Sequence, residues 1–236
     1  MTIPLQSIHI VSDTDELAKN LAEDVAKELN QAILERGQAT LVVSGGSTPK
    51  PFFHYLSKTE LDWDKVLITL ADERCVEPGD DQSNSKLIRD YLIQNQASMA
   101  AFLPLFRGGQ ADQSAAEKIS TKLSELPTYD VVVLGMGNDG HTASIFPEAQ
   151  NRDEALDNQQ SAAALLVDPV TVTPLRITQT ATRLLNSRFL AVHITGREKA
   201  YLLNRVIATP NQEQWPISHF VSQEKVAVGI YCDINI

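Results

Sequence analysis

Basic residues are scarce in this 236-residue sequence. It contains 20 Lys and Arg against 30 Asp and Glu, which gives a formal net charge of −10 at pH 7. Proteins that bind the phosphate backbone of nucleic acids rely on clustered Lys and Arg. We therefore expect no nucleic-acid partner. A small anionic ligand is compatible with this charge, because the field inside a pocket can oppose the net charge of the protein.

Long apolar runs and cysteines are scarce too. No apolar run approaches the length of a membrane span, and the first residues, Met1 to Leu5, lack the basic and apolar regions of a signal peptide. The two cysteines, Cys75 and Cys232, are not spaced like metal ligands and suit a reducing compartment. We therefore predict a cytoplasmic protein without a membrane partner.

Linkers, repeats and low-complexity segments are absent from the sequence, so we expect residues 1–236 to form a single domain. A hydrophobic content of 43% is ordinary for a globular protein and sufficient for a sizeable core. Nothing in the pattern indicates an oligomeric state.

Apolar runs alternate with amphipathic segments along the chain. Runs typical of strands occupy residues 7–11, 39–43, 66–70, 129–134, 163–167, 189–194 and 226–231, and helical patterns occupy 17–36, 84–92, 113–123 and 197–207. This alternation predicts an α/β fold with a mostly parallel, doubly wound, Rossmann-like sheet and helices on both faces. Ligands of such sheets bind beyond the carboxyl ends of the strands. We expect three of these ends to meet at one edge, those followed by residues 44–49, 72–74 and 135–141.

The first of these segments is Ser44-Gly45-Gly46-Ser47-Thr48-Pro49. Pro49 suits the first position of a helix and Thr48 suits its N-cap. The loop would then present free backbone N–H groups and two hydroxyl groups to an anion. We predict that a phosphate group binds to Gly45, Gly46, Ser47 and Thr48. Taken alone, such a segment is more often a plain strand-to-helix turn.

The third segment offers Asp139 and His141 directly after a buried strand. A histidine has an ordinary pKa of about 6.5, so it is largely neutral at cytosolic pH and can accept a proton from water. We predict that His141 is a general base and later a proton donor to a leaving oxygen, and that Asp139 orients the imidazole or the water. In isolation, this pattern is usually a turn whose aspartate caps a helix.

Further motifs carry a resemblance to a known family. They are Gly45 to Pro49, Asp72-Glu73-Arg74 followed by Ser83-Asn84, Gly135 to Pro147, Pro174 to Thr178, and Gly196 to Ala200. In these motifs the sequence resembles the 6-phosphogluconolactonase family over most of its length, and the segment 135–147 is specific. The resemblance implies hydrolysis of the ring ester of 6-phospho-D-glucono-1,5-lactone in the oxidative pentose phosphate pathway, without a metal or an organic cofactor.

The resemblance adds candidates for substrate binding. Arg74, Arg176 and Lys199 are cationic candidates for the phosphate, since Arg offers a planar fork and Lys a point charge. Asp72 is expected to orient Arg74 or a sugar hydroxyl group, and Gly140 is also placed among the substrate-binding residues. Charged residues at strand and helix ends are often only solvated, and that alternative stays open here.

Other polar residues are given no part in the chemistry. Ser144 and Cys75 have no patterned base nearby, and the Gly-x-Ser-x-Gly elbow is absent, so we expect direct attack by water. The remaining histidines are expected to be structural or surface residues, with His219 an outside candidate for the site; they are His9, His54, His193 and His219.

Three alternatives remain at this point. The similar fold of glucosamine-6-phosphate deaminase would use the same loop with Asp72 as the base, although Arg74 favours the lactonase because the deaminase tends to carry an aromatic residue there. A sugar-phosphate sensor would lack the base. A metal hydrolase would use Asp72, Asp139 and His141, without the usual spacing of zinc ligands. The C-terminal segment 232–236 departs from the usual ending of the lactonases.

Overall fold

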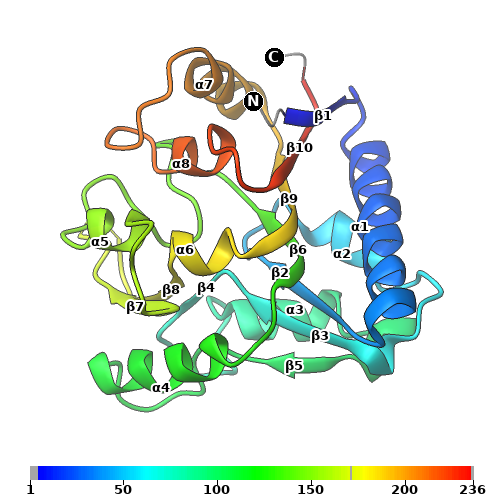
Figure 1. The fold of residues 1–236 in the computed structure, drawn as a ribbon, viewed down its shortest axis with the longest axis horizontal. Helices are drawn as coiled ribbons and strands as arrows, with labels where there is room; N and C mark the ends of the chain where they lie inside the picture. Colours follow the sequence, from blue (N-terminus) through cyan, green and yellow to red (C-terminus); the bar gives the residue numbers. More distant parts are fainter. Residues whose placement is uncertain (1–4, 171, 235–236) are drawn as a thin grey trace.

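The computed structural model describes residues 5–170 and 172–234, so the first four residues and the end of the unusual C-terminal segment lie outside the described part. Its main sheet has seven strands: β1 (Leu5–Ile10), β2 (Ala39–Val43), β3 (Val66–Leu70), β5 (Ala101–Leu103), β6 (Tyr129–Leu134), β9 (Ser187–Ile194) and β10 (Ala227–Cys232). They lie in the order β1-β10-β9-β6-β2-β3-β5, and every neighbouring pair is parallel. The predicted mostly parallel sheet is therefore confirmed (Figure 1).

Helices cover both faces of this sheet (Figure 1). One hydrophobic core contains buried residues of α1 (Thr14–Arg36), α2 (Lys50–Leu56), α3 (Asn84–Tyr91) and α4 (Gln113–Ser124). A second core contains those of α5 (Arg152–Leu156), α6 (Ala181–Leu184), α7 (Arg197–Ala208) and α8 (Ile217–Val221). Along β6, Val131 and Val133 face the first core, while Val132 and Leu134 face the second. Burial on both faces explains why this strand is a continuous apolar run.

The longest helix, α1, shows how local signals set the elements. Its N-cap is Asp13, whose carboxylate accepts a hydrogen bond from the Asp15 amide at 2.8 Å. Gly37 ends the helix in the left-handed conformation, with φ of 77°, and donates its N–H to the Ile33 carbonyl. Within the described ranges, neither this helix nor any other combines the length and apolarity that a membrane span requires.

A second, antiparallel sheet has the strand order β4-β8-β7, with β4 (Asp72–Arg74), β8 (Arg176–Gln179) and β7 (Ala164–Val167). The expectation that residues 163–167 continue the parallel alternation is wrong, because β7 pairs only with β8 in this small sheet. A strand of three polar residues such as β4 shows no apolar period, and its partner lies about a hundred residues away. The sequence pattern therefore does not reveal the second sheet.

Gln179 joins the two sheets. Its side-chain amide donates to the Leu70 carbonyl at the end of β3, at 2.7 Å, and its side-chain oxygen accepts from the Tyr129 hydroxyl at 2.8 Å. Its backbone N–H donates to the Ala71 carbonyl at 2.9 Å. Both side chains of the Gln179–Tyr129 pair are fully buried. These bonds fix β8, and through it β4, at the carboxyl end of β3.

Replacing Gln179 by leucine should therefore destabilise the protein. Gln179→Leu removes the hydrogen bonds to the buried Tyr129 hydroxyl and to the Leu70 carbonyl, so the free energy of unfolding should fall by about 2 to 4 kcal/mol. Urea unfolding measures the change. The exposed Gln159→Leu is the matched control, with an expected change within about 0.5 kcal/mol. Equal effects in the two variants would contradict the role of Gln179.

Candidate active site

A cavity of about 240 Å³ lies at the carboxyl ends of β2, β6 and β9 and against β4 and β8. Most of the predicted site residues line it: Gly45, Gly46, Ser47, Thr48, Asp72, Arg74, His141, Arg176 and Lys199. The structure thus brings together the three segments that the sequence places at one edge. Asp139 and Gly140 are not part of the lining. Asp139 contacts His141 instead, and Gly140 packs against Trp215.

The loop after β2 lines the cavity and has unpaired backbone amides. None of the described residues accepts a hydrogen bond from the amides of residues 45–48. The loop also passes very close to α3, since a Cβ on Gly45 would lie 1.9 Å from Oδ1 of Asn84. Four free N–H groups beside a cavity form an environment that suits an anion.

The predicted cap of the following helix is wrong. Helix α2 begins at Lys50, and Pro49 takes the N-cap position without a side-chain hydrogen bond. Pro49 already has a helical ψ of −4°, and its carbonyl accepts from the Phe53 amide at 2.8 Å. The Thr48 hydroxyl is consequently not used by the helix and lies 3.4 Å from the Thr195 hydroxyl.

Asp139 and His141 form a close pair, of which His141 lines the cavity. Oδ1 of Asp139 lies 2.6 Å from Nδ1 of His141. A carboxylate at this nitrogen favours the tautomer with the proton on Nδ1, which leaves Nε2 as a proton acceptor. Burial raises the pKa of Asp139, but its hydrogen bonds and its charge interaction with His141 together hold that pKa below its usual range. The pair packs onto Gly137, where a Cβ would lie 2.2 Å from Nδ1.

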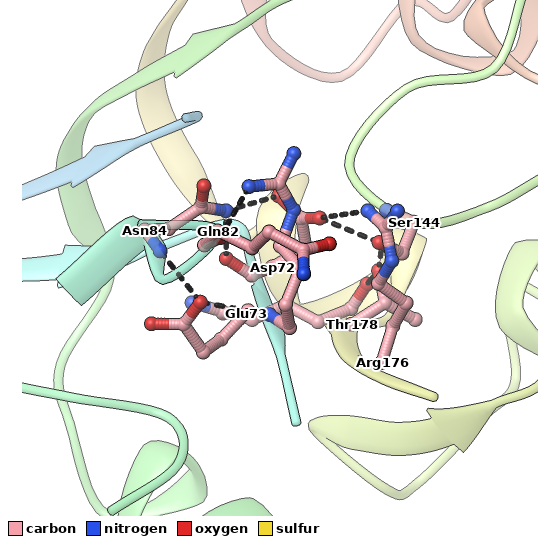
Figure 2. Close-up of polar contacts among 9 residues, drawn as sticks. Asp72, Glu73, Gln82, Asn84, Ser144, Arg176 and Thr178 are labelled. Carbon is pink, nitrogen blue, oxygen red and sulfur yellow. Dashed lines mark hydrogen bonds and ion pairs between the residues drawn. The ribbon is translucent and has the colours of Figure 1, made fainter. Parts of the chain in front are cut away.

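Asp72 is held by several neighbours on the wall that β4 and β8 build (Figure 2). Its carboxylate accepts from the Ser144 hydroxyl at 2.5 Å and lies 3.9 Å from Nη1 of Arg176. The Asn84 side chain donates to its backbone carbonyl at 2.9 Å. These contacts fix the position of the Asp72 carboxylate relative to Ser144 and Arg176. Asn84 also lines the cavity, although its place in the sequence did not indicate a site residue.

Glu73 holds β4 to the start of α3. Its buried carboxylate accepts from the backbone amides of Arg74, Asn84 and Ser85 at 2.7, 2.7 and 2.6 Å. Burial raises its pKa, and these hydrogen bonds oppose the rise. The pairing of Asp72-Glu73-Arg74 with Ser83-Asn84 in the sequence therefore reflects a structural contact that supports the wall.

Three cations face the cavity in a chain of net charge −10. Arg74 and Arg176 are opposite each other in the β4–β8 register, and the Nε atom of each is buried without a partner among the described residues. Burial lowers the pKa of Arg176 and of Lys199, and nearby Asp72 and Asp139 respectively oppose this effect. Lys199 forms no ion pair with a described residue. Cationic side chains with unpaired N–H donors inside a cavity favour an anionic ligand.

The other reactive side chains are not activated. Ser144 is fully buried and donates its hydroxyl to Asp72. Burial raises the pKa of the Cys75 thiol to about 11, so it stays protonated at neutral pH. Across residues 5–170 and 172–234, no three His, Cys, Asp or Glu side chains are grouped so that they could hold a metal ion.

His193 at the end of β9 is buried, as expected of a structural histidine, and is only 3% exposed. It also lines the cavity, which was not expected from the sequence. Neither ring nitrogen has a hydrogen-bond partner in the described chain, and burial lowers its pKa to about 4. Its position near the carboxyl end of the apolar run 189–194 is the sequence signal that places His193 at the cavity. Among the others, His9 stacks on Tyr231 and His219 contacts Gln212 outside the cavity.

Comparisons with known proteins agree with this architecture. A sequence model of the family described as glucosamine-6-phosphate isomerases/6-phosphogluconolactonase matches residues 12–228. The 6-phosphogluconolactonase of Rhizobium meliloti is 40% identical over 226 residues, which cover 95% of this chain and 97% of that protein. The crystal structure of a 6-phosphogluconolactonase from Shewanella baltica is 38% identical with a TM-score of 0.93, covering 98% of this chain and 99% of the other. A monomeric glucosamine-6-phosphate deaminase, 17% identical with a TM-score of 0.74 over 95% and 96% of the two chains, shares the fold.

The burial of His193 predicts a pH effect on stability. An unfolded histidine binds a proton below a pKa of about 6.5, whereas His193 in the folded protein does so only below about 4. As the pH falls through this window, protonation of the unfolded chain should remove about 3 kcal/mol of unfolding free energy. Urea unfolding at pH 7 and pH 4 should show this loss for the wild type relative to His193→Leu. The exposed His54→Leu should follow the wild type, and parallel behaviour of all three proteins would contradict the assignment.

Proposed function

The chain belongs to the family of glucosamine-6-phosphate isomerases and 6-phosphogluconolactonases, and we propose that it hydrolyses 6-phospho-D-glucono-1,5-lactone to 6-phospho-D-gluconate in the oxidative pentose phosphate pathway. The observation that carries the proposal is one cavity lined by two chemically different sets of groups. The set that suits an ester is His141 with its hydrogen bond to Asp139. The set that suits a phosphate is the free amides of residues 45–48 and the cations Arg74, Arg176 and Lys199.

The phosphate group binds to the loop of residues 45–48. Its oxygens accept hydrogen bonds from the free backbone amides there, and the positive charges of Arg74, Arg176 and Lys199 offset the charge of the phosphate. Binding at this end places the lactone ring towards His141. Fixing the distance between ester and base in this way removes much of the entropic part of the barrier.

The hydrolysis uses water and His141. Nε2 of His141 accepts a proton from a water molecule while the water oxygen attacks C1 of the lactone. The tetrahedral intermediate carries negative charge on the former carbonyl oxygen. The C1–ring-oxygen bond then breaks, and the protonated His141 returns its proton to the ring oxygen. No covalent enzyme intermediate forms in this reaction, and no cofactor takes part.

A second candidate function is that of a glucosamine-6-phosphate deaminase. It would need Asp72 to move a proton between C1 and C2 of the sugar. The Asp72 carboxylate already accepts a hydrogen bond from Ser144 and lies near Arg176, and these contacts favour an orienting role.

We also propose that the protein is cytoplasmic. Its two cysteines, Cys75 and Cys232, are free thiols, which suits a reducing compartment.

An assay with both substrates tests the proposed function. The lactone is generated in situ by glucose-6-phosphate dehydrogenase, and its hydrolysis is followed against the uncatalysed rate with and without a chelator. We expect fast hydrolysis that the chelator does not reduce, and no ammonia from glucosamine 6-phosphate. Ammonia release without lactone hydrolysis would replace the lactonase by the deaminase.

Removal of the proposed base should abolish most of the turnover. His141→Ala should lower kcat by about 10²- to 10⁴-fold, because proton transfer in the transition state is lost. Its KM should change little. The exposed His54→Ala serves as the control with wild-type kinetics. Wild-type-like kcat in His141→Ala would disprove the assignment of the base.

Removal of the cations should act mainly on binding. Lys199→Ala and Arg176→Ala should each raise KM by about 10- to 100-fold with a smaller effect on kcat, since the phosphate is held in ground state and transition state alike. Steady-state kinetics at several lactone concentrations separate the two parameters. Lys27→Ala, an exposed lysine of α1, is the matched control. An unchanged KM in the cavity variants would place the phosphate elsewhere.

A further inference from the structure

His193 has no task in the hydrolysis proposed above, although it faces the same cavity. Its side chain is only 3% exposed, and neither Nδ1 nor Nε2 has a hydrogen-bond partner among the described residues. Buried polar groups without a partner carry a free-energy cost, and folded proteins retain few of them. Because the imidazole lines the cavity, a ligand that enters the cavity can supply the missing partner.

The neighbours of His193 place it near the loop of residues 44–49. The hydroxyl of Thr195, two residues further along the chain, lies 3.4 Å from the Thr48 hydroxyl of that loop. The ring of Phe52, in the helix that follows the loop, meets the imidazole edge-on with 6.3 Å between the ring centroids. His193 therefore belongs to the part of the cavity that surrounds the loop amides.

The imidazole is neutral at this place. Its pKa is lowered to about 4, mainly by burial; Asp233 opposes this shift and the charge of Lys199 adds to it. A neutral imidazole has one N–H donor and one acceptor nitrogen. Phosphate oxygens accept hydrogen bonds, so the donor nitrogen has a natural partner in a phosphate group. The acceptor nitrogen can take a hydrogen bond from a water molecule that accompanies the ligand.

From this placement we infer that His193 is a phosphate-binding residue, whose neutral imidazole donates a hydrogen bond to the phosphate of the bound sugar. Lys and Arg attract any anion by charge, including a sugar carboxylate. A fixed N–H donor near the loop recognises the phosphate oxygens themselves. His193 therefore increases the preference for phosphorylated over unphosphorylated sugars. This inference rests on the proposed function for the identity of the sugar phosphate.

Calorimetric titration of the full chain tests the inference without turnover. The ligands are 6-phospho-D-gluconate, inorganic phosphate and D-gluconate at pH 7.5. His193→Leu should weaken binding of both phosphate compounds by about 3- to 10-fold and leave D-gluconate unchanged. His193→Gln retains an N–H donor and should recover most of the affinity. His219→Leu is the matched control, because His219 is also buried with an unpaired Nε2 but lies outside the cavity.

Several results would overturn the inference. Unchanged phosphate affinity in His193→Leu would do so, as would equal losses in His193→Leu and His219→Leu, or a wild type that binds no phosphate compound. If His193→Leu does not fold, His193→Gln and His193→Phe decide the question, since only the glutamine keeps a donor. A wild type that binds phosphate through His193 but does not hydrolyse the lactone would contradict the proposed function alone.

Discussion

Burial of the main sheet on both faces is the constraint on which the rest of the structure depends. Strands such as β2 and β6 are covered by helices on either side, so their apolar residues leave no surface for chemistry along the strands. Polar groups can be exposed only where the strands end. The parallel direction of the strands brings several such ends to one edge, and the cavity lies there. The fold thus determines the place of the site before any single side chain determines its chemistry.

A second constraint completes the cavity from outside the main sheet. The small antiparallel sheet carries Asp72, Arg74 and Arg176, and the buried bonds of Gln179 fix it to the end of β3. Its cations bring positive charge to a protein of net charge −10. His141, which is hydrogen-bonded to Asp139, lines the same cavity of about 240 Å³. We propose that the cations and the loop amides bind the phosphate and that His141 activates water.

The sequence predicted the parallel sheet because its strands are long apolar runs bounded by glycines or polar residues. It also predicted which segments meet, because the edge of a parallel sheet follows from strand direction alone. It did not predict the small sheet, since a pairing such as Arg74 with Arg176 is non-local and β4 is too short to show a period. It misplaced the helix cap at Thr48, where Pro49 already has helical geometry. It passed over His193, although the rule that located His141 applies equally to the end of β9.

The central claim is that the cavity holds the sugar phosphate in one orientation, with its phosphate at the loop and its C1 at His141. A crystal structure of the chain with the product 6-phospho-D-gluconate tests this most directly. The account predicts phosphate oxygens within hydrogen-bond distance of the amides of residues 45–48 and of the His193 imidazole. It also predicts the C1 carboxylate beside Nε2 of His141. A product bound in the reverse orientation, or outside this cavity, would contradict it.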